Sequence, residues 1–192
     1  MLNGIFTPFP ILTTERLTLR QLSIDDQQKI FELRSDKEIN KYLDRQTSKT
    51  IEDAINFINK VNDNIKKSNS IYWVITLTRT RTFVGTICLF DFSNEKRSCE
   101  IGYELMPKYQ RRGIMKEAAE KVIGYAFQTL QFQKIIAFTH KGNENSTKLL
   151  TKLNFMKSIE KVKENPDLNM FTLIYSSAHK ILNQIPNIQN QR

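Results

Sequence analysis

The segment 100–121 constrains the fold more than any other part of the chain, because its pattern changes period in the middle. Residues 100–105 alternate in polarity, which predicts a β-strand. Pro107 lacks a backbone donor and is expected to end that strand. Apolar residues then recur at helical spacing over 115–130, which predicts a long helix with one broad apolar stripe. A strand, a short link and a long helix therefore form the centre of the predicted fold.

The link between this strand and this helix carries Gln110, Arg111, Arg112 and Gly113. The start of a helix leaves backbone N–H groups unpaired and has partial positive charge. Glycine lets a ligand approach the main chain closely, and arginine presents forked donors that suit phosphate oxygens. The pattern predicts an anion cradle for a pyrophosphate. An ordinary connection is the competing interpretation, because a glycine before a helix and two surface arginines are common. The dinucleotide and P-loop glycine patterns are absent.

The sequence Gln-Arg-Arg-Gly-Ile-Met at 110–115 resembles the acetyl-CoA signature of the GNAT superfamily of N-acetyltransferases. Its flanks, Glu-Ile-Gly-Tyr-Glu-Leu at 100–105 and Gly-Ile-Met-Lys-Glu-Ala at 113–118, resemble the RimJ/RimL-like branch, which acetylates protein N-terminal amines. One position departs from the family pattern. Met115 stands where the family most often has Gly or Ala.

Two further regions carry the same resemblance in the right order. Thr-Glu-Arg-Leu-Thr-Leu-Arg at 14–20 is similar to the start of the branch. Asn143, Ser146 and the later Lys-Leu-Asn-Phe at 152–155 resemble the family's Asn-x-x-Ser and Lys-x-Gly-Phe. Asn154 replaces that glycine, and asparagine tolerates the left-handed conformation well. The resemblance spans about residues 12–175, and three separated matches make it specific.

The expected fold class is α+β (mixed α/β), in a single GNAT-like domain over 1–192. Residues 1–10 are expected as an N-terminal arm and 186–192 as a loose tail. The family resemblance implies a twisted, mostly antiparallel sheet of six to seven strands, splayed between the fourth and fifth, with helices on both faces. The patterns predict strands at 12–22, 71–77, 83–90, 100–105, 134–139, 155–163 and 170–175. They predict helices after Ser23 and Thr50, a short turn at 39–43, and helices at 115–130, after Asn143 and at 178–185.

Composition limits the class of protein. Lys and Arg number 29 against 20 Asp and Glu, which gives a formal charge of +9. The basic residues form no dense tract and accompany no nucleic-acid motif, so no specific nucleic-acid binding is expected. Cys88, Cys99, His140 and His179 have no metal-ligand spacing, and no metal is expected. No apolar run is long enough to span a bilayer, so a cytoplasmic location without a membrane partner is expected.

The resemblance implies acetyl-CoA as the acyl donor, held along the edge of the Glu100 strand and at the following helix start. A backbone N–H near Leu105 would then point at the thioester carbonyl. The acetyl group would pass directly to the amine in a ternary complex. The implied acetyl-CoA-binding residues are Leu105, Met106, Gln110, Arg111, Arg112, Gly113, Ile114, Met115, Asn143 and Ser146.

Three side chains are candidates for catalysis. Glu100 and Glu104 lie on the same strand face, and either could accept the amine proton directly or through a water. Glu100 is further from the cradle and nearer the expected amine, so it is favoured as the base, with Glu104 orienting the acceptor. Ser146 matches the family's serine near the sulfur. The competing interpretation is that both acids are ordinary surface residues and that Ser146 is a polar residue in the first turn of a helix. His140, which ends a predicted strand, is a further candidate for proton transfer.

The predicted function is acetyl-CoA-dependent N-acetylation of a primary amine, with the α-amine of a ribosomal-protein-like N-terminus as the first choice. A polyamine or an antibiotic amine is left open as the acceptor. A non-catalytic basic module that binds CoA and docks on the ribosome is the alternative outside the enzyme class. Assembly as a homodimer is also left open.

Overall fold

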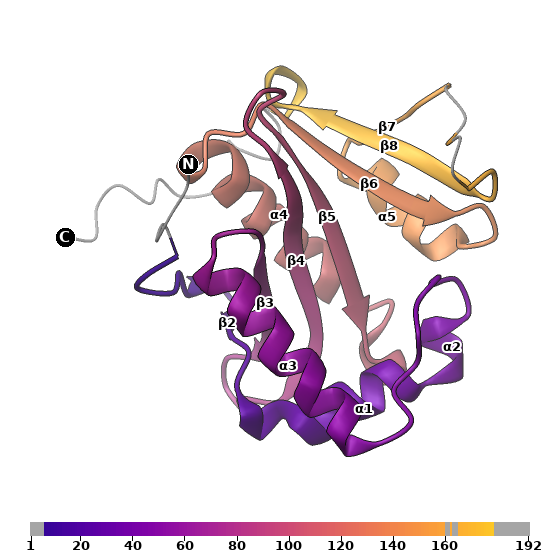
Figure 1. The fold of residues 1–192 in the computed structure, drawn as a ribbon. Coiled ribbons are helices and arrows are strands. Elements are labelled where there is room, and N and C mark those ends of the chain that lie inside the picture. The colour runs from indigo at the N-terminus through magenta and orange to yellow at the C-terminus, as the bar shows by residue number, and fades with distance from the viewer. Residues whose placement is uncertain (1–5, 160–161, 163–164, 179–192) are drawn as a thin grey trace.

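One eight-stranded sheet organises the chain, in the order β1-β2-β3-β4-β5-β6-β8-β7 (Figure 1). The computed structural model describes residues 6–159, 162 and 165–178. All neighbouring strands run antiparallel except β5 and β6, which are parallel. The strands are β1 (Leu12–Thr13), β2 (Leu17–Gln21), β3 (Ile71–Leu77), β4 (Phe83–Ser93), β5 (Ser98–Leu105), β6 (Lys134–His140), β7 (Met156–Lys157) and β8 (Leu168–Ile174).

Helices cover both faces of this sheet, so the predicted α+β architecture is confirmed. The helices α1 and α3 lie on one face and α4 on the other (Figure 1). They are α1 (Gln27–Ser35), α2 (Lys37–Asn40), α3 (Ile51–Lys66), α4 (Ile114–Gly124) and α5 (Glu144–Lys152). Within the described residues, no helix has the length and apolar character needed to cross a membrane.

The prediction of one continuous strand over 12–22 is wrong, and this explains why the sheet has eight strands. The chain reverses at Thr14, so that Leu12 of β1 pairs with Leu19 of β2. Thr14 donates its N–H to the Leu17 carbonyl at 2.9 Å, and its hydroxyl accepts the Leu17 N–H at 3.0 Å. Residues 13–16 are four consecutive polar residues, so the alternation of polar and apolar residues is interrupted at this turn and resumes in β2.

The predicted helix 115–130 consists of the α-helix α4 followed by a π-helical segment. This segment is Tyr125–Thr129, and the Leu130 N–H bonds the Tyr125 carbonyl five residues back. The side-chain stripe is nearly the same in both helical forms, so periodicity does not distinguish them.

The two predicted C-terminal strands differ in outcome. The strand expected at 155–163 is limited to β7, whereas the strand expected at 170–175 is confirmed as β8. Residues 160, 161, 163 and 164 lie outside the described residues, as do the predicted helix beyond residue 178 and the predicted tail.

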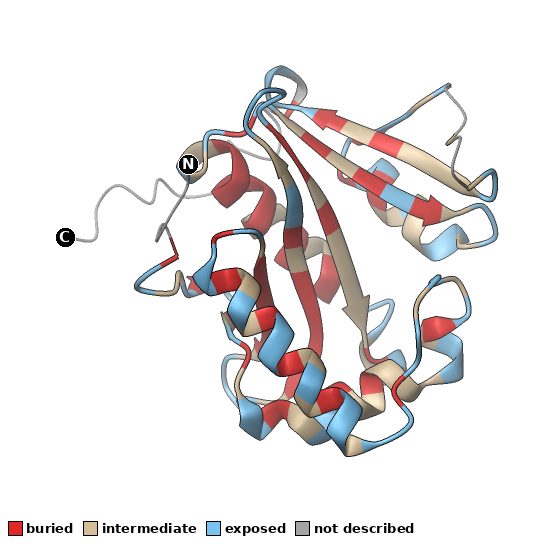
Figure 2. Cartoon of the chain, viewed as in Figure 1, coloured by how far each residue is buried: buried red, intermediate tan, exposed pale blue. Residues whose placement is uncertain are grey.

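Local signals for caps and turns are confirmed. The Thr50 hydroxyl accepts the Asp53 N–H, and Asp53 bonds back to the Thr50 N–H, which begins α3. Asn143 caps α5 by accepting the Ser146 N–H at 3.1 Å. Asn154 follows α5 with a φ of 61°, the left-handed conformation expected there. Figure 2 shows that α3 is amphipathic, with buried and exposed residues alternating along the helix.

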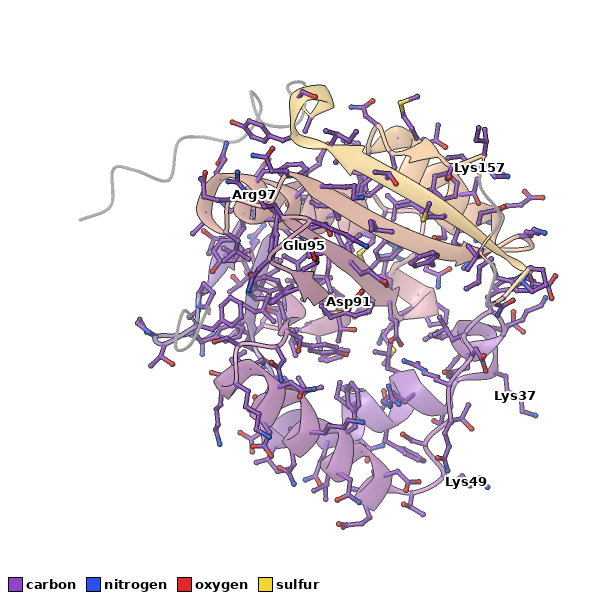
Figure 3. The ribbon with its side chains drawn as sticks, turned by 45° about the horizontal axis from the view of Figure 1, so that its top comes forward. Lys37, Lys49, Asp91, Glu95, Arg97 and Lys157 are labelled. Carbon is purple, nitrogen blue, oxygen red and sulfur yellow. The ribbon has the colours of Figure 1, made fainter. Side chains whose placement is uncertain are left out.

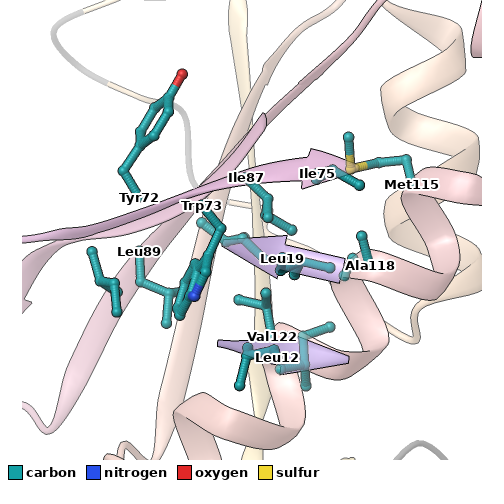
Figure 4. Close-up of a cluster of buried hydrophobic side chains, with 14 of the residues drawn as sticks. Leu12, Leu19, Tyr72, Trp73, Ile75, Ile87, Leu89, Met115, Ala118 and Val122 are labelled. Atoms are coloured by element: carbon teal, nitrogen blue, oxygen red, sulfur yellow. The ribbon is translucent and has the colours of Figure 1, made fainter. Parts of the chain in front are cut away.

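The main core lies between the central strands and α4 (Figure 4). Trp73, Ile87 and Tyr103 occupy equivalent positions in β3, β4 and β5, and the Trp73 ring contacts Tyr125 at the end of α4. Met115 is 7% exposed and belongs to this cluster with Ala118. Its side chain therefore takes part in the core as well as standing at the helix start.

The pairing of β5 with β6 covers only the first part of β5. It ends where Glu100 pairs with Ile136, and Figure 1 shows the two strands diverging beyond that point. The predicted splay is confirmed. Met106 donates its N–H to Val84 of β4 at 2.9 Å. Since successive residues in a strand point their N–H groups to opposite sides, those of Tyr103 and Leu105 face the gap.

A carboxylate on α4 ties the first hairpin to the helix. Glu117 accepts hydrogen bonds from the Thr14 hydroxyl and from Arg16, whose Nε lies 2.7 Å from Glu117 Oε2. Desolvation raises the pKa of Glu117, but the bonds from Thr14 and Arg16 together hold this pKa below its ordinary value. The β1–β2 turn is therefore fixed against the first turn of α4 by a charged acceptor.

Replacement of Glu117 by Gln is expected to lower the free energy of unfolding by about 1–2 kcal/mol at pH 7, because it removes a charged hydrogen-bond acceptor. A lowered pKa in the folded protein gives stabilisation that is present above the ordinary value of 4.5 and is lost as pH falls through the folded pKa. Urea denaturation should show the wild-type advantage at pH 7, decreasing below pH 4.5.

The matched control is Glu120→Gln, on the same helix. Glu120 pairs with Lys116 one turn earlier on the same helix, and such a local pair contributes only about 0.3–0.5 kcal/mol. Equal losses in the two variants, or a Glu117→Gln deficit that grows on acidification, would contradict the role given to Glu117.

Candidate active site

The cradle predicted between β5 and α4 is an open turn with two left-handed residues. Gly113 immediately precedes α4 with a φ of 75°, and Arg111 has a φ of 60°. A Cβ built on Gly113 would meet only the Arg16 guanidinium, at 3.5 Å, so the space above this residue is open. Strained backbone of this kind is typical of ligand-binding turns. The α4 start therefore presents its N–H groups to an accessible surface.

Neighbouring side chains hold this turn in place. The Gln110 Nε2 donates to the Leu105 carbonyl at 3.1 Å. The Arg16 Nη1 donates to the Arg112 carbonyl at 3.3 Å. Gln110 and Arg16 thus fix the two ends of the loop, the first to β5 and the second to the β1–β2 turn.

A cleft of about 740 Å³ joins the cradle to the gap beside β5. It includes most of the site residues that the sequence predicted. Lining it are Glu104, Leu105, Gln110, Arg111, Gly113, Ile114, Met115, Asn143 and Ser146. The predicted site residues that do not line it are Glu100, Met106 and Arg112.

The cleft suits a long ligand with an anionic end. At the cradle end lie Gly113, with open space above it, the start of α4 and Arg111. Lys116 and Lys152 also line the cleft and add positive charge. The other end follows the backbone edge of β5, whose N–H groups are available to amide and thioester oxygens. The described residues therefore fit acetyl-CoA, with its diphosphate at the helix start. They contain no group of three or more His, Cys, Asp or Glu that could hold a metal ion.

Ser146 has a hydroxyl partner that the sequence did not reveal. Its Oγ lies 2.9 Å from the hydroxyl of Tyr103, which also lines the cleft. Burial raises the pKa of Tyr103 to about 12, with the Ser146 bond acting in the opposite direction. Tyr103 therefore remains a neutral phenol at neutral pH. In the sequence, Tyr103 falls on the same strand face as Ile101 and Leu105, and this pattern does not indicate a contact with α5.

Glu104 is held by an arginine from the loop between α2 and α3. The two carboxylate oxygens lie 2.5 and 2.7 Å from the Nη1 and Nη2 of Arg45. The Arg45 Nε donates to Asn40, which joins this pair to the end of α2. The side chains of Arg45 and Glu104 are only 18% and 15% exposed, so the carboxylate is largely committed to this ion pair. The sequence gave no indication of Arg45, because its loop carries no motif.

Glu100 lies at the apex of the gap, where β5 and β6 begin to separate. Desolvation is the main cause that raises its pKa to about 7, and the nearby Asp91 carboxyl adds to the effect by repulsion and hydrogen bonding. Figure 3 shows Asp91 on the sheet, well apart from Lys37 and Lys49 at the α2 and α3 side. Glu100 can therefore exchange a proton near neutral pH.

An aromatic contact crosses the open side of the gap. The ring of Tyr42, which follows α2, stacks on the ring of His140 at the end of β6 with 5.4 Å between centroids. His140 Nδ1 also accepts the Gly142 N–H at 3.0 Å. The sequence singled out His140 but not Tyr42. Their contact joins the loop after α2 to the end of β6.

The fold and this cleft define an acyl-CoA-binding acetyltransferase. Residues 16–156 match the family described as Acetyltransferase (GNAT) domain, and the chain belongs to that family. It is an N-acetyltransferase of the RimJ/RimL-like group.

Individual relatives agree at the level of the family. The chain is 36% identical to the uncharacterized N-acetyltransferase YoaA of Bacillus subtilis over 149 residues, which cover 78% of this chain and 84% of YoaA. It is 29% identical over 101 residues, half of each chain, to the Escherichia coli [ribosomal protein uS5]-alanine N-acetyltransferase. The spermidine N-acetyltransferase of Vibrio cholerae, solved with CoA and spermine, has the same fold, with a TM-score of 0.75 at 20% identity. That alignment covers 86% of this chain and 99% of the other.

Comparison of Gly113→Glu with Gly113→Gln should test the cradle. Both variants carry the same strain, about 1–2 kcal/mol for a left-handed residue with a side chain, and differ only in charge. The Glu variant is expected to bind CoA about 10²-fold more weakly than the Gln variant at low salt, because its carboxylate would face the diphosphate. Titration calorimetry measures both affinities.

The difference between these two variants should decrease as salt screens the added charge. Equal affinities in two folded variants would mean that the diphosphate binds elsewhere.

Proposed function

We propose that this acetyltransferase acts on the N-terminal α-amine of a protein, of the kind found on ribosomal proteins. The cleft is the observation that carries this proposal. It runs from an anion cradle along the free edge of β5, and Glu100 lies at the apex of the same gap. An amine that enters at the apex would meet the acetyl end of a donor anchored at the cradle.

The charge of the cleft favours a single amine over a polyamine. Within the described part of the chain, its acidic lining consists of Glu38 and Glu104, and Glu104 is already paired with Arg45. Its basic lining is more extensive: Lys41, Arg111 and Lys152 are joined by Lys116 and Lys148, which pair with Glu120 and Glu144 outside the lining. A polycation needs several free carboxylates, whereas a peptide brings one α-amine and a largely neutral backbone. The E. coli relative, whose name specifies alanine of ribosomal protein uS5, supports the same class of acceptor.

The residues divide the reaction between them. The backbone from Leu105 to Met115 would hold acetyl-CoA, with its N–H groups on the thioester carbonyl and on the diphosphate. Glu100 would accept the proton from the attacking amine, directly or through a water. Ser146 would donate a hydrogen bond to the sulfur as the carbon–sulfur bond breaks and its electron pair stays on sulfur. Glu104, neutralised by Arg45, would shape the acceptor path.

A panel of acceptors tests the proposal. Acetyl-CoA binding is measured by calorimetry, and thiol release is then followed with peptides that begin with Ala or Ser, with spermidine and with an aminoglycoside. We expect a kcat/KM at least about tenfold higher for the free peptides than for spermidine, a difference of 1.4 kcal/mol or more. The same peptides with a blocked α-amine are the matched control and should give no thiol release.

Preference for spermidine or the aminoglycoside would refute the acceptor class. Binding of acetyl-CoA without turnover of any amine would favour the non-catalytic module. Salt-sensitive binding to ribosomes would support that alternative.

Glu100→Gln is expected to lower kcat by about 10²-fold near neutral pH, because the amide cannot accept a proton. With a pKa of about 7, Glu100 is protonated in acid, so wild-type activity should rise as pH increases through 7. The variant should lack the rise near pH 7 and gain activity only at higher pH, where the amine arrives neutral, so that it approaches the wild type there. Acetyl-CoA affinity should not change.

Asp91→Asn provides the matched variant for this pH profile. Removal of the Asp91 charge should lower the pKa of Glu100 and move the rise in activity to lower pH, without loss of maximal rate. If Glu104→Gln abolishes the rise and Glu100→Gln retains it, the roles of the two glutamates are exchanged.

A further inference from the structure

We propose that Tyr103 is a positioning residue for Ser146: its phenol donates a hydrogen bond to Ser146 Oγ and directs the Ser146 hydroxyl proton at the thioester sulfur. The inference rests on the proposed site of the sulfur beside Ser146. It does not depend on which amine accepts the acetyl group.

The geometry brings two hydroxyls together from different elements. Tyr103 comes from the part of β5 that β6 does not cover, and Ser146 comes from the first turn of α5. Their oxygens are 2.9 Å apart, and both side chains line the cleft. The Asn143 cap holds the Ser146 backbone, and the β3–β4–β5 register holds Tyr103, so neither partner needs to be ordered by the ligand.

The direction of this bond follows from the chemistry of the two groups. A phenol is a stronger acid than an aliphatic alcohol, so the favoured arrangement has Tyr103 as donor and Ser146 Oγ as acceptor. That arrangement occupies one Ser146 lone pair and leaves its proton free for another acceptor. A hydroxyl that already accepts a hydrogen bond is also a better donor, because bonds in a chain polarise each other.

Tyr103 itself is too weak an acid to protonate the leaving sulfur. Its pKa is raised to about 12 by burial, whereas a thiol of the cysteine type has a pKa of about 8.5. Full proton transfer from the phenol to the thiolate would therefore be uphill. The sulfur finally takes a proton released by the amine through Glu100 or solvent, while Tyr103 and Ser146 both keep theirs.

The expected size of the effect comes from the freedom of the Ser146 hydroxyl. Without Tyr103, the hydroxyl can take three staggered orientations, and equal population of these would reduce the fraction aimed at sulfur about threefold. This corresponds to about 0.5 unit in the pKa of a bound thiol. Complete loss of the hydroxyl in Ser146→Ala should raise the bound thiol pKa by about one unit, as expected for one hydrogen bond to a charged group.

The test measures the pKa of the CoA thiol when CoA is bound, from the ultraviolet absorbance of the thiolate, with no acceptor present. Tyr103→Phe should raise this pKa by about 0.5 unit and lower kcat about threefold, with CoA affinity and melting temperature nearly unchanged. The double variant Tyr103→Phe/Ser146→Ala should have the same thiol pKa as Ser146→Ala alone, because Tyr103 acts only through Ser146.

The matched control is Tyr125→Phe, which removes a phenol hydroxyl from the core beside Trp73 and should leave the bound thiol pKa unchanged. An unchanged thiol pKa in Tyr103→Phe would overturn the proposal. The proposal would also be overturned if Tyr103→Phe raised the bound thiol pKa equally in the wild type and in Ser146→Ala, or if the wild type failed to bind CoA. A protein that binds CoA and shows the predicted cycle but acetylates no peptide would refute the proposed acceptor while supporting this role for Tyr103.

Discussion

The incomplete pairing of β5 with β6 is the constraint on which the rest of the site depends. A parallel pair normally satisfies the backbone of both strands along their length, yet here the pairing stops at Glu100. Beyond that residue, the β5 edge facing the gap is available to a ligand backbone in place of a strand. The free edge of β5, the apex and the cleft are all consequences of this single divergence.

The divergence is maintained by contacts at both ends of the cleft. At the cradle, Arg16 links Glu117 of α4 to the Arg112 carbonyl. At the other end, Arg45 joins the α2–α3 loop to Glu104, and Tyr42 stacks on His140 across the gap. These are polar or aromatic contacts at specified geometry, whereas the apolar core lies mainly beneath the central strands (Figure 2). The core therefore fixes the sheet, and the polar contacts fix the shape of the opening.

Sequence patterns predicted the parts of this structure that depend on neighbours along the chain. The Thr50–Asp53 cap, the left-handed Asn154 and the strand that ends before Pro107 all follow from local propensities. The turn at Thr14 is marked by four consecutive polar residues, 13–16, which the prediction of a single strand over 12–22 did not take into account.

The side chains that complete the cleft could not be predicted in the same way. Arg45 meets Glu104 across a sequence separation of 59, and Tyr103 meets Ser146 across 43. Nothing in the local pattern distinguishes either residue from an ordinary loop arginine or a core tyrosine. Their roles depend on tertiary contact, which a single sequence reveals only through a recognised motif.

The alternation of β5 assigns different chemistry to its two faces. Glu100 and Glu104 point to the side covered by α3, as shown by the contact of Phe57 on α3 with Tyr72, which is in register with Gly102. Tyr103 points to the opposite side, toward α4 and α5. The two glutamates and the hydroxyl pair of Tyr103 and Ser146 therefore lie on opposite sides of the β5 backbone. Because the N–H groups of that backbone lie in the plane between them, a carbonyl held at the free edge would be reachable from both faces. The period of two in a β-strand is therefore sufficient to keep Glu100 from pairing with Tyr103 and with the Ser146 hydroxyl that Tyr103 contacts.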